Sequence, residues 1–104
     1  MTFTVTFSPS AKEDLERLFD FLLDRAETVD DLELAQSAIE AIQTAVTTLL
    51  SRSPYSFRKS GIRSTRRELI IPFGATGYVA LYEIAGPSLV VILAVRHQRE
   101  EDYH

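Results

Sequence analysis

The chain contains no cysteine and no tryptophan, and only two of its 104 residues are histidines. The absence of cysteine excludes disulfide scaffolds, thiolate zinc sites and cysteine nucleophiles. His97 and His104 both lie at the C-terminal end, so neither a cluster of histidine ligands nor a helix-borne HExxH zinc motif can form. We therefore expect no metal site and no cofactor.

Long apolar runs are also missing. The longest, residues 89–95, has seven residues, whereas a helix that spans a bilayer needs roughly 20. The first seven residues contain no basic segment followed by an apolar one and no small-residue cleavage site, so we expect no secretory signal. Together with the lack of cysteine, these features predict a cytoplasmic protein that does not bind membranes.

The composition is that of an ordinary globular domain, with 45% hydrophobic and 25% charged residues. A chain of this length has room for one core, so we expect a single domain over residues 1–104.

Charge is distributed unevenly along the chain. Residues 1–51 carry three basic against ten acidic side chains, and residues 52–104 carry eight basic against five acidic ones. Six of those eight lie in the acid-free stretch 52–67. Such a stretch is either a solvated loop and strand face or a binding surface for nucleic acid or an acidic protein. The overall pI of about 5.1 argues against nonspecific binding to duplex DNA.

The first half of the chain predicts a strand and two helices. Residues 3–7 alternate apolar and polar side chains, which is typical of a half-buried strand. A helix then begins either with Ser8 as its cap and Pro9 in its first turn, or with a capping box formed by Ser10 and Glu13. Asp30 is the expected cap of a second helix. The apolar stripes of the two helices contain Leu15, Leu18, Phe19, Leu22 and Ala26, and Ala35, Ala38, Ile39, Ile42, Val46, Leu49 and Leu50.

The second half predicts a loop over residues 51–61 and strands over 66–73, 78–85 and 89–96. The last strand is apolar on both faces, so it belongs in the interior of a sheet, beside the first strand. We expect an α+β fold of the order β-α-α-β-β-β. In this fold a helical hairpin packs on one face of an antiparallel four-stranded sheet of order 1-4-3-2. We expect Leu93 to lie beneath the hairpin and the other face to receive a partner.

Four segments of this pattern resemble the RelE/ParE superfamily of toxins, and its ParE-like branch in particular. They are residues 8–15, residues 61–69 with their basic side chains, residues 78–83 and residues 91–99. The resemblance covers nearly the whole chain. It implies a toxin of a type II toxin-antitoxin module that a cognate ParD-like antitoxin neutralises in a tight complex. ParE-like members poison DNA gyrase, whereas RelE-like members cut messenger RNA on the ribosome.

RNA cleavage requires a base for the ribose 2′-hydroxyl, cations for the charged phosphorane and an acid for the leaving oxygen. If the chain is a ribonuclease, the candidates are Arg67, Arg96, His97 and Tyr103. RelE-like enzymes concentrate lysines and arginines around the sheet, whereas the lysines here are Lys12 and Lys59 alone. Strand alternation also separates Arg66 from Arg67. We therefore expect no catalytic residue.

Binding of a target without catalysis needs only positioned charge. The candidate target-binding residues are Arg63, Arg66, Arg67, Arg96 and Arg99. Glu83 is expected to pair across the sheet with Arg67 or Arg96. Three functions remain open: a gyrase inhibitor that does not itself bind DNA sequence-specifically, a ribosome-dependent endoribonuclease, and a degenerate toxin that binds only its antitoxin.

Overall fold

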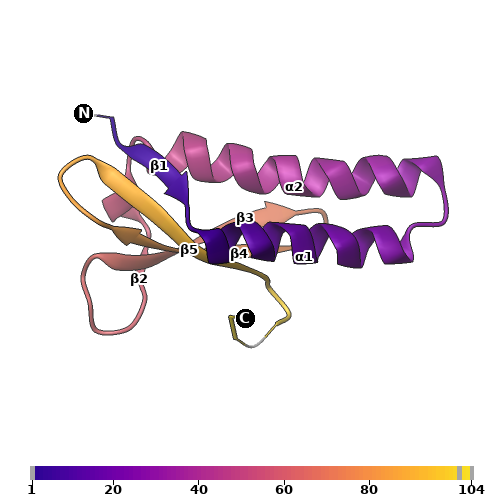
Figure 1. Cartoon of the computed structure of the whole chain (residues 1–104). Coiled ribbons are helices and arrows are strands. Elements are labelled where there is room, and N and C mark those ends of the chain that lie inside the picture. The colour runs from indigo at the N-terminus through magenta and orange to yellow at the C-terminus, as the bar shows by residue number, and fades with distance from the viewer. Residues whose placement is uncertain (1, 101, 104) are drawn as a thin grey trace.

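A computed structural model describes residues 2–100 and 102–103 of the chain. The sheet strands are β1 (Thr4–Phe7), β2 (Arg58–Lys59), β3 (Arg66–Phe73), β4 (Thr76–Ile84) and β5 (Leu89–His97). Helices α1 (Pro9–Arg25) and α2 (Val29–Leu50) separate β1 from the other strands, and a 3-10 turn, Pro54–Ser56, precedes β2. The two helices form a hairpin on one face of the sheet (Figure 1). The predicted α+β class and the helical hairpin are confirmed.

The strands are ordered β1-β5-β4-β3-β2, which confirms the predicted order and adds the two-residue β2 at one edge. The sheet is only mostly antiparallel, because β1 pairs parallel to β5. The hairpin explains the parallel pair: α2 returns the chain to the start of β1, where Phe3 N donates to Ser51 O at 2.7 Å. The next long strand, β3, therefore runs in the direction of β1, and so does β5.

Side-chain caps set the start of both helices. The Ser8 hydroxyl accepts a hydrogen bond from Ala11 N at 3.1 Å, so the first of the two predicted starts of α1 is the one used. The predicted start of α2 is wrong by two residues, since Thr28 rather than Asp30 is the cap and accepts from Asp31 N at 3.1 Å. The Asp31 carboxylate in turn accepts from Glu27 N, and this reciprocal arrangement favours the earlier start.

The hydrophobic core lies between the hairpin and the sheet. The predicted Leu18, Ile42 and Val46 are buried in it, and Leu22 packs against it partly exposed. Leu49, predicted to be buried, is 41% exposed. The remaining fully buried side chains of the core come mainly from α2 and the central strands: Ala11, Ala38, Leu50, Leu69, Ala80, Tyr82, Val90, Ile92 and Val95.

A β-bulge in β5 decides which of its side chains face the hairpin. Leu81 pairs with Ala94 and Tyr82 pairs with Ile92, so Leu93 has no partner on β4. One extra residue reverses the alternation of side chains along the strand. Leu93 consequently lies outside the core, contrary to the prediction, while Ile92 and Val95 both belong to it.

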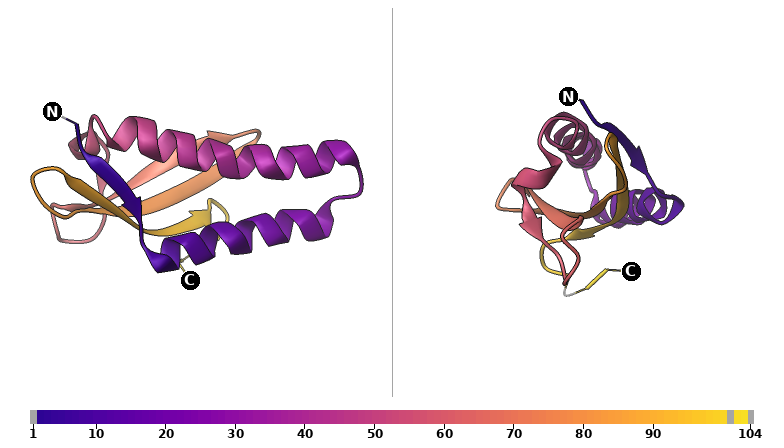
Figure 2. Two further views of the ribbon diagram at one scale, coloured as in Figure 1. Left: turned by 45° about the horizontal axis from the view of Figure 1, so that its top comes forward. Right: turned by 90° about the vertical axis from the view of Figure 1, so that its left-hand side faces the viewer.

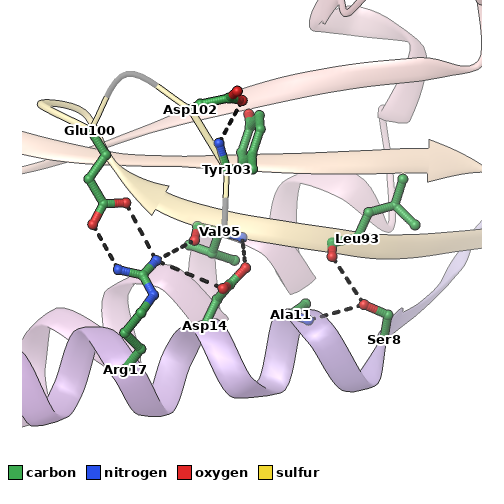
Figure 3. A network of polar contacts seen from close by, with 9 residues as sticks. All are labelled: Ser8, Ala11, Asp14, Arg17, Leu93, Val95, Glu100, Asp102 and Tyr103. Atoms are coloured by element: carbon green, nitrogen blue, oxygen red, sulfur yellow. Dashed lines mark hydrogen bonds and ion pairs between the residues drawn. The ribbon is translucent and has the colours of Figure 1, made fainter.

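Helix α1 takes the place of a strand along the second half of β5. β1 ends at Phe7, opposite Ile92, and leaves the backbone of the following residues without a strand partner. Ser8 Oγ donates to Leu93 O at 3.2 Å, and the buried Asp14 carboxylate accepts from Val95 N at 2.8 Å (Figure 3). The burial of this carboxylate is therefore compensated by a hydrogen bond to the sheet backbone.

The hairpin is longer than the sheet that it covers. Its distal half projects past the end of the strands (Figures 1 and 2), and the molecule measures 45 × 27 × 25 Å. Within the described residues, neither helix is both long enough and apolar enough to cross a membrane.

Candidate functional site

The face of the sheet away from the hairpin, here called the open face, carries paired charges. Glu68 binds Arg58 at 2.8 Å, and Glu83 lies 3.2 Å from Arg66 and 3.8 Å from Arg63. Both carboxylates are largely buried, with 14% and 15% of the side chain exposed. A hydrogen bond from Thr65, supported by Arg66 and Arg63, lowers the pKa of Glu83. Much of the basic stretch 52–67 is thus neutralised within the protein.

The arginine partner of Glu83 was predicted incorrectly. Arg66 stands directly opposite Glu83 in the β3–β4 register. Arg67 is opposite the core residue Tyr82 and therefore points to the hairpin face, and Arg96 is opposite Val79, four residues from Glu83 along β4. Side chains that share a row and a face make the contact, and these two arginines do not.

Residues 98–100 and 102–103, here called the C-terminal segment, reach the open face, so this face is not left wholly uncovered as predicted. The Tyr103 hydroxyl donates to Glu68, and the Arg96 guanidinium lies 5.1 Å from the centre of the Tyr103 ring. Arg96 also donates to Glu100 O at 2.7 Å. Burial, together with the Glu68 carboxylate, raises the pKa of the Tyr103 hydroxyl. In Figure 1 the yellow stretch of chain that follows β5 lies on the side of the sheet away from α2.

A second contact holds the C-terminal segment to α1. Arg17 Nη1 donates to Glu100 at 2.8 Å, and the same guanidinium lies 3.8 Å from Asp14 and donates to Val95 O at 3.4 Å (Figure 3). The sequence gives no signal for this contact, because Arg17 and Glu100 are 83 positions apart.

The four residues considered for ribonuclease chemistry do not come together. Arg67 and His97 lie on the hairpin face, and Arg96 and Tyr103 lie on the open face. On the hairpin face, Arg67 is opposite Tyr82 and His97 is opposite Tyr78. Four residues of strand separate these rows, which corresponds to about 13 Å. On the open face, Arg96 does lie beside Tyr103, but the Tyr103 hydroxyl is bound to Glu68.

Arg67 and His97 both make contacts within the protein. Arg67 donates to Phe57 O at 2.7 Å and to Tyr55 O at 2.9 Å, which fixes the loop after α2 to the sheet. His97 Nδ1 accepts from Arg99 N at 3.1 Å, so Nε2 carries the proton toward Thr76 Oγ1 at 3.2 Å. His104 lies outside the described residues.

Arg99 differs from the other candidate arginines. Its side chain is exposed, and among the described residues its guanidinium has neither a hydrogen bond nor an ion pair. Arg63 is 64% exposed and forms an ion pair with Glu83 at 3.8 Å. Of the five predicted target-binding residues, Arg99 and Arg63 are therefore the most accessible to a binding partner.

An apolar cavity of about 710 Å³ lies beneath the projecting half of the hairpin. Two arginines, Arg25 and Arg99, and two acids, Asp31 and Glu100, contribute to its lining. Sequence reasoning missed this cavity, although Phe21 and Leu34 are apolar, lie off the predicted stripes, and are 52% and 59% exposed. The apolar lining residues are Leu18, Phe21, Leu22, Ala26, Leu34, Ala35, Ala38, Phe73 and Tyr78.

The described residues contain no group of three histidine or carboxylate side chains that could hold a metal ion. Most of the charged side chains described above bind one another or the backbone, so the chemistry that this arrangement supports best is recognition by charge and apolar contact.

Comparisons with known proteins agree with this architecture. A family model described as the ParE toxin of the type II toxin-antitoxin system, parDE, matches residues 5–102. Two curated proteins of Caulobacter vibrioides are similar: Toxin RelE3 is 37% identical over 93% of this chain and 96% of its own length, and Toxin RelE1 is 35% identical over 88% and 89%.

Two solved structures share the fold. One is the chromosomal ParDE system from P. aeruginosa, with a TM-score of 0.71 at 17% identity, covering 92% of this chain and 96% of that one. The other is the toxin-antitoxin complex RelBE2 from Mycobacterium tuberculosis, with a TM-score of 0.63 at 24% identity, covering 96% and 95%.

Proposed function

Because the chain belongs to the ParE family of toxins from type II toxin-antitoxin systems, we propose that it inhibits DNA gyrase by binding it, without a catalytic step. We further propose that a ParD-like antitoxin neutralises it in a tight complex.

The separation of the acid–base candidates supports inhibition by binding. A ribonuclease needs its base, acid and cations around one phosphate, whereas Arg67 and His97 lie on the opposite face of the sheet from Arg96 and Tyr103. The raised pKa of Tyr103 and its hydrogen bond to Glu68 also make it a poor base near neutral pH. Messenger RNA cleavage is therefore the alternative that the experiment must score.

The cavity beneath the hairpin supports an antitoxin that folds as it binds. Its apolar walls suit one face of an amphipathic helix, and the charged residues of its lining, Arg25, Arg99, Asp31 and Glu100, can pair with charged side chains of that helix. Since Arg99 belongs both to this lining and to the C-terminal segment, an antitoxin seated here would cover a cation that the target needs. Neutralisation would then follow from occupancy of a shared residue.

Expression of the chain without its antitoxin tests the proposal. We expect a DNA damage response, intact transcripts, and inhibition of supercoiling by purified gyrase. His97→Gln should keep the DNA damage response and the intact transcripts, since no proton transfer at this ring is required, and should weaken supercoiling inhibition only as far as the hydrogen bond from Arg99 N is lost. Cleaved transcripts that disappear in His97→Gln would instead establish the endoribonuclease, and an inert wild-type chain would establish a degenerate toxin.

Arg99→Ala should weaken gyrase inhibition at least about tenfold, because a hydrogen bond to a charged group contributes about 1.5–3 kcal/mol. Arg52→Ala is the matched control, since Arg52 is an exposed arginine outside both the C-terminal segment and the cavity lining. Equal effects of the two substitutions would show that net charge, rather than Arg99, is responsible.

A further inference from the structure

We infer that Arg17 on α1 is a positioning residue for target recognition: together with Glu68 on β3 it anchors the C-terminal segment, so that Arg99 is presented to the target in a fixed place. The inference rests on the proposed function in one respect, namely that the C-terminal segment contacts the target. No part of it requires Arg17 to touch the target itself.

The first anchor is the ion pair between Arg17 and Glu100. Nη1 donates to one carboxylate oxygen at 2.8 Å and Nη2 to the other at 3.4 Å, a two-pronged contact that fixes orientation as well as distance. Both side chains are mostly buried, since only 33% of the Arg17 side chain and 27% of the Glu100 side chain are exposed. The neighbouring Asp14, itself bound to Val95 N, holds the guanidinium from the side of α1 (Figure 3).

The second anchor lies on the open face. The Tyr103 hydroxyl donates to Glu68, whose other oxygen is held by Arg58 at 2.8 Å. Arg96 is placed between the anchors, with its guanidinium over the Tyr103 ring and a 2.7 Å bond to Glu100 O. The contacts thus reach α1, β3 and β5 at once.

Between the end of β5 and Glu100 the backbone is also fixed. Gln98 N donates to Gly77 O and Glu100 N donates to His97 O, both at 3.0 Å. Arg99 N donates to His97 Nδ1 at 3.1 Å, while its guanidinium remains exposed. An arginine whose backbone is held before binding loses less conformational freedom when it meets a partner, so the complex is tighter. This is the physical benefit that Arg17 provides.

The test compares Arg17→Gln and Arg17→Lys with the control Lys12→Gln, which removes an exposed cation from the same helix. Amide hydrogen exchange of the purified full-length toxin is followed in peptides that cover residues 96–104, and growth inhibition is measured in cells. For Arg17→Gln we expect exchange about tenfold faster in this region and about tenfold weaker toxicity. Arg17→Lys, which keeps the charge, should recover part of both, and Lys12→Gln should change neither.

Three controls keep the result interpretable. The thermal unfolding midpoint and the far-UV circular dichroism spectrum show whether Arg17→Gln has damaged the fold, and Glu100→Gln removes the same ion pair from the other side if it has. The double variant should be no worse than either single variant, as expected for partners in one interaction.

Unchanged exchange in Arg17→Gln would overturn the anchoring role. Faster amide exchange with unchanged toxicity in Arg17→Gln would overturn the proposal that Arg17 positions Arg99 for the target. Both readouts are independent of which target is hit, because growth inhibition is scored whether cells show DNA damage or cleaved transcripts. Cleaved transcripts in the wild type would therefore refute the proposed gyrase inhibition and still leave the dependence on Arg17 measurable.

Discussion

The arginines of the second half of the chain differ in what their guanidinium groups contact. Arg58, Arg63 and Arg66 neutralise two carboxylates of the sheet. Arg67 and Arg96 are bound to backbone carbonyl groups, and each has its guanidinium near a tyrosine ring. A sequence shows only that a basic residue is present; the cross-strand register determines which of them remain available to a partner.

The Glu83 pair predicts a specific dependence of stability on pH. Its folded-state pKa is lowered, first by the hydrogen bond from Thr65 and then by Arg66 and Arg63, so the ionised form stabilises the fold above the unfolded pKa of about 4.5. Glu83→Gln should cost about 1 kcal/mol at pH 7. This difference should shrink as the pH falls through the lowered pKa, when the wild-type carboxylate is protonated too.

Urea denaturation of both proteins between pH 7 and pH 3 measures this difference. Glu13→Gln is the control, because Glu13 is exposed on α1. A gap between wild type and Glu83→Gln that is the same at every pH would show that packing, and not charge, accounts for it.

At the scale of single elements, the pattern of apolar residues in β5 predicts the position of the strand in the sheet but not which of its side chains face the hairpin. Its apolar run correctly places it inside the sheet, beside the first strand. The bulge at Leu93 cannot be predicted from alternation, because every residue from 89 to 95 is apolar and a shift of one leaves the pattern unchanged. Since that shift turns Arg96 to the open face and His97 to the hairpin face, the arrangement of the candidate site depends on it.

The first turn of α1 gives a prediction at the same scale. Ser8 caps the helix and also donates to Leu93 O at the bulge, whereas Ser10 is exposed within the helix. Ser8→Ala should therefore lower the free energy of unfolding by about 1–2 kcal/mol. Ser10→Ala should be close to neutral in the same denaturant titration, and a comparable loss there would mean that Ser10 contributes to the cap.

At the scale of the whole molecule, the projecting hairpin creates the cavity. The sequence predicts the two helices and their core stripes, but it does not show that the helices extend beyond the end of the strands. The 22 residues of α2 span about 33 Å at 1.5 Å per residue. The nine residues of β4 span about 30 Å when straight. The twist and offset of the sheet, visible in Figure 2, therefore matter as much as length.

Phe21 provides a test of the cavity as the antitoxin site. Phe21→Asp should weaken antitoxin binding at least tenfold, because burying an aromatic side chain contributes about 1.5–3 kcal/mol. The substitution is compatible with the fold, since Phe21 is half exposed and Arg25 lies over its ring. Val29→Asp is the matched control, an exposed apolar residue of the hairpin outside the cavity lining. Isothermal titration with the antitoxin distinguishes the two, and equal losses would place the site elsewhere.

The parallel pairing of β1 with β5 has a consequence for the synthesis of the protein. Strand β1 is synthesised before the other strands but cannot pair until β5 has been synthesised, because Thr4 is in register with Leu89. Until residues 89–97 emerge, the sheet lacks the strand that joins β1 to β4. Contacts between positions so far apart in the sequence form late in folding. The sheet of a growing chain therefore cannot be completed before residues 89–97 have been synthesised, and until then the chain lacks the complete fold of the toxin.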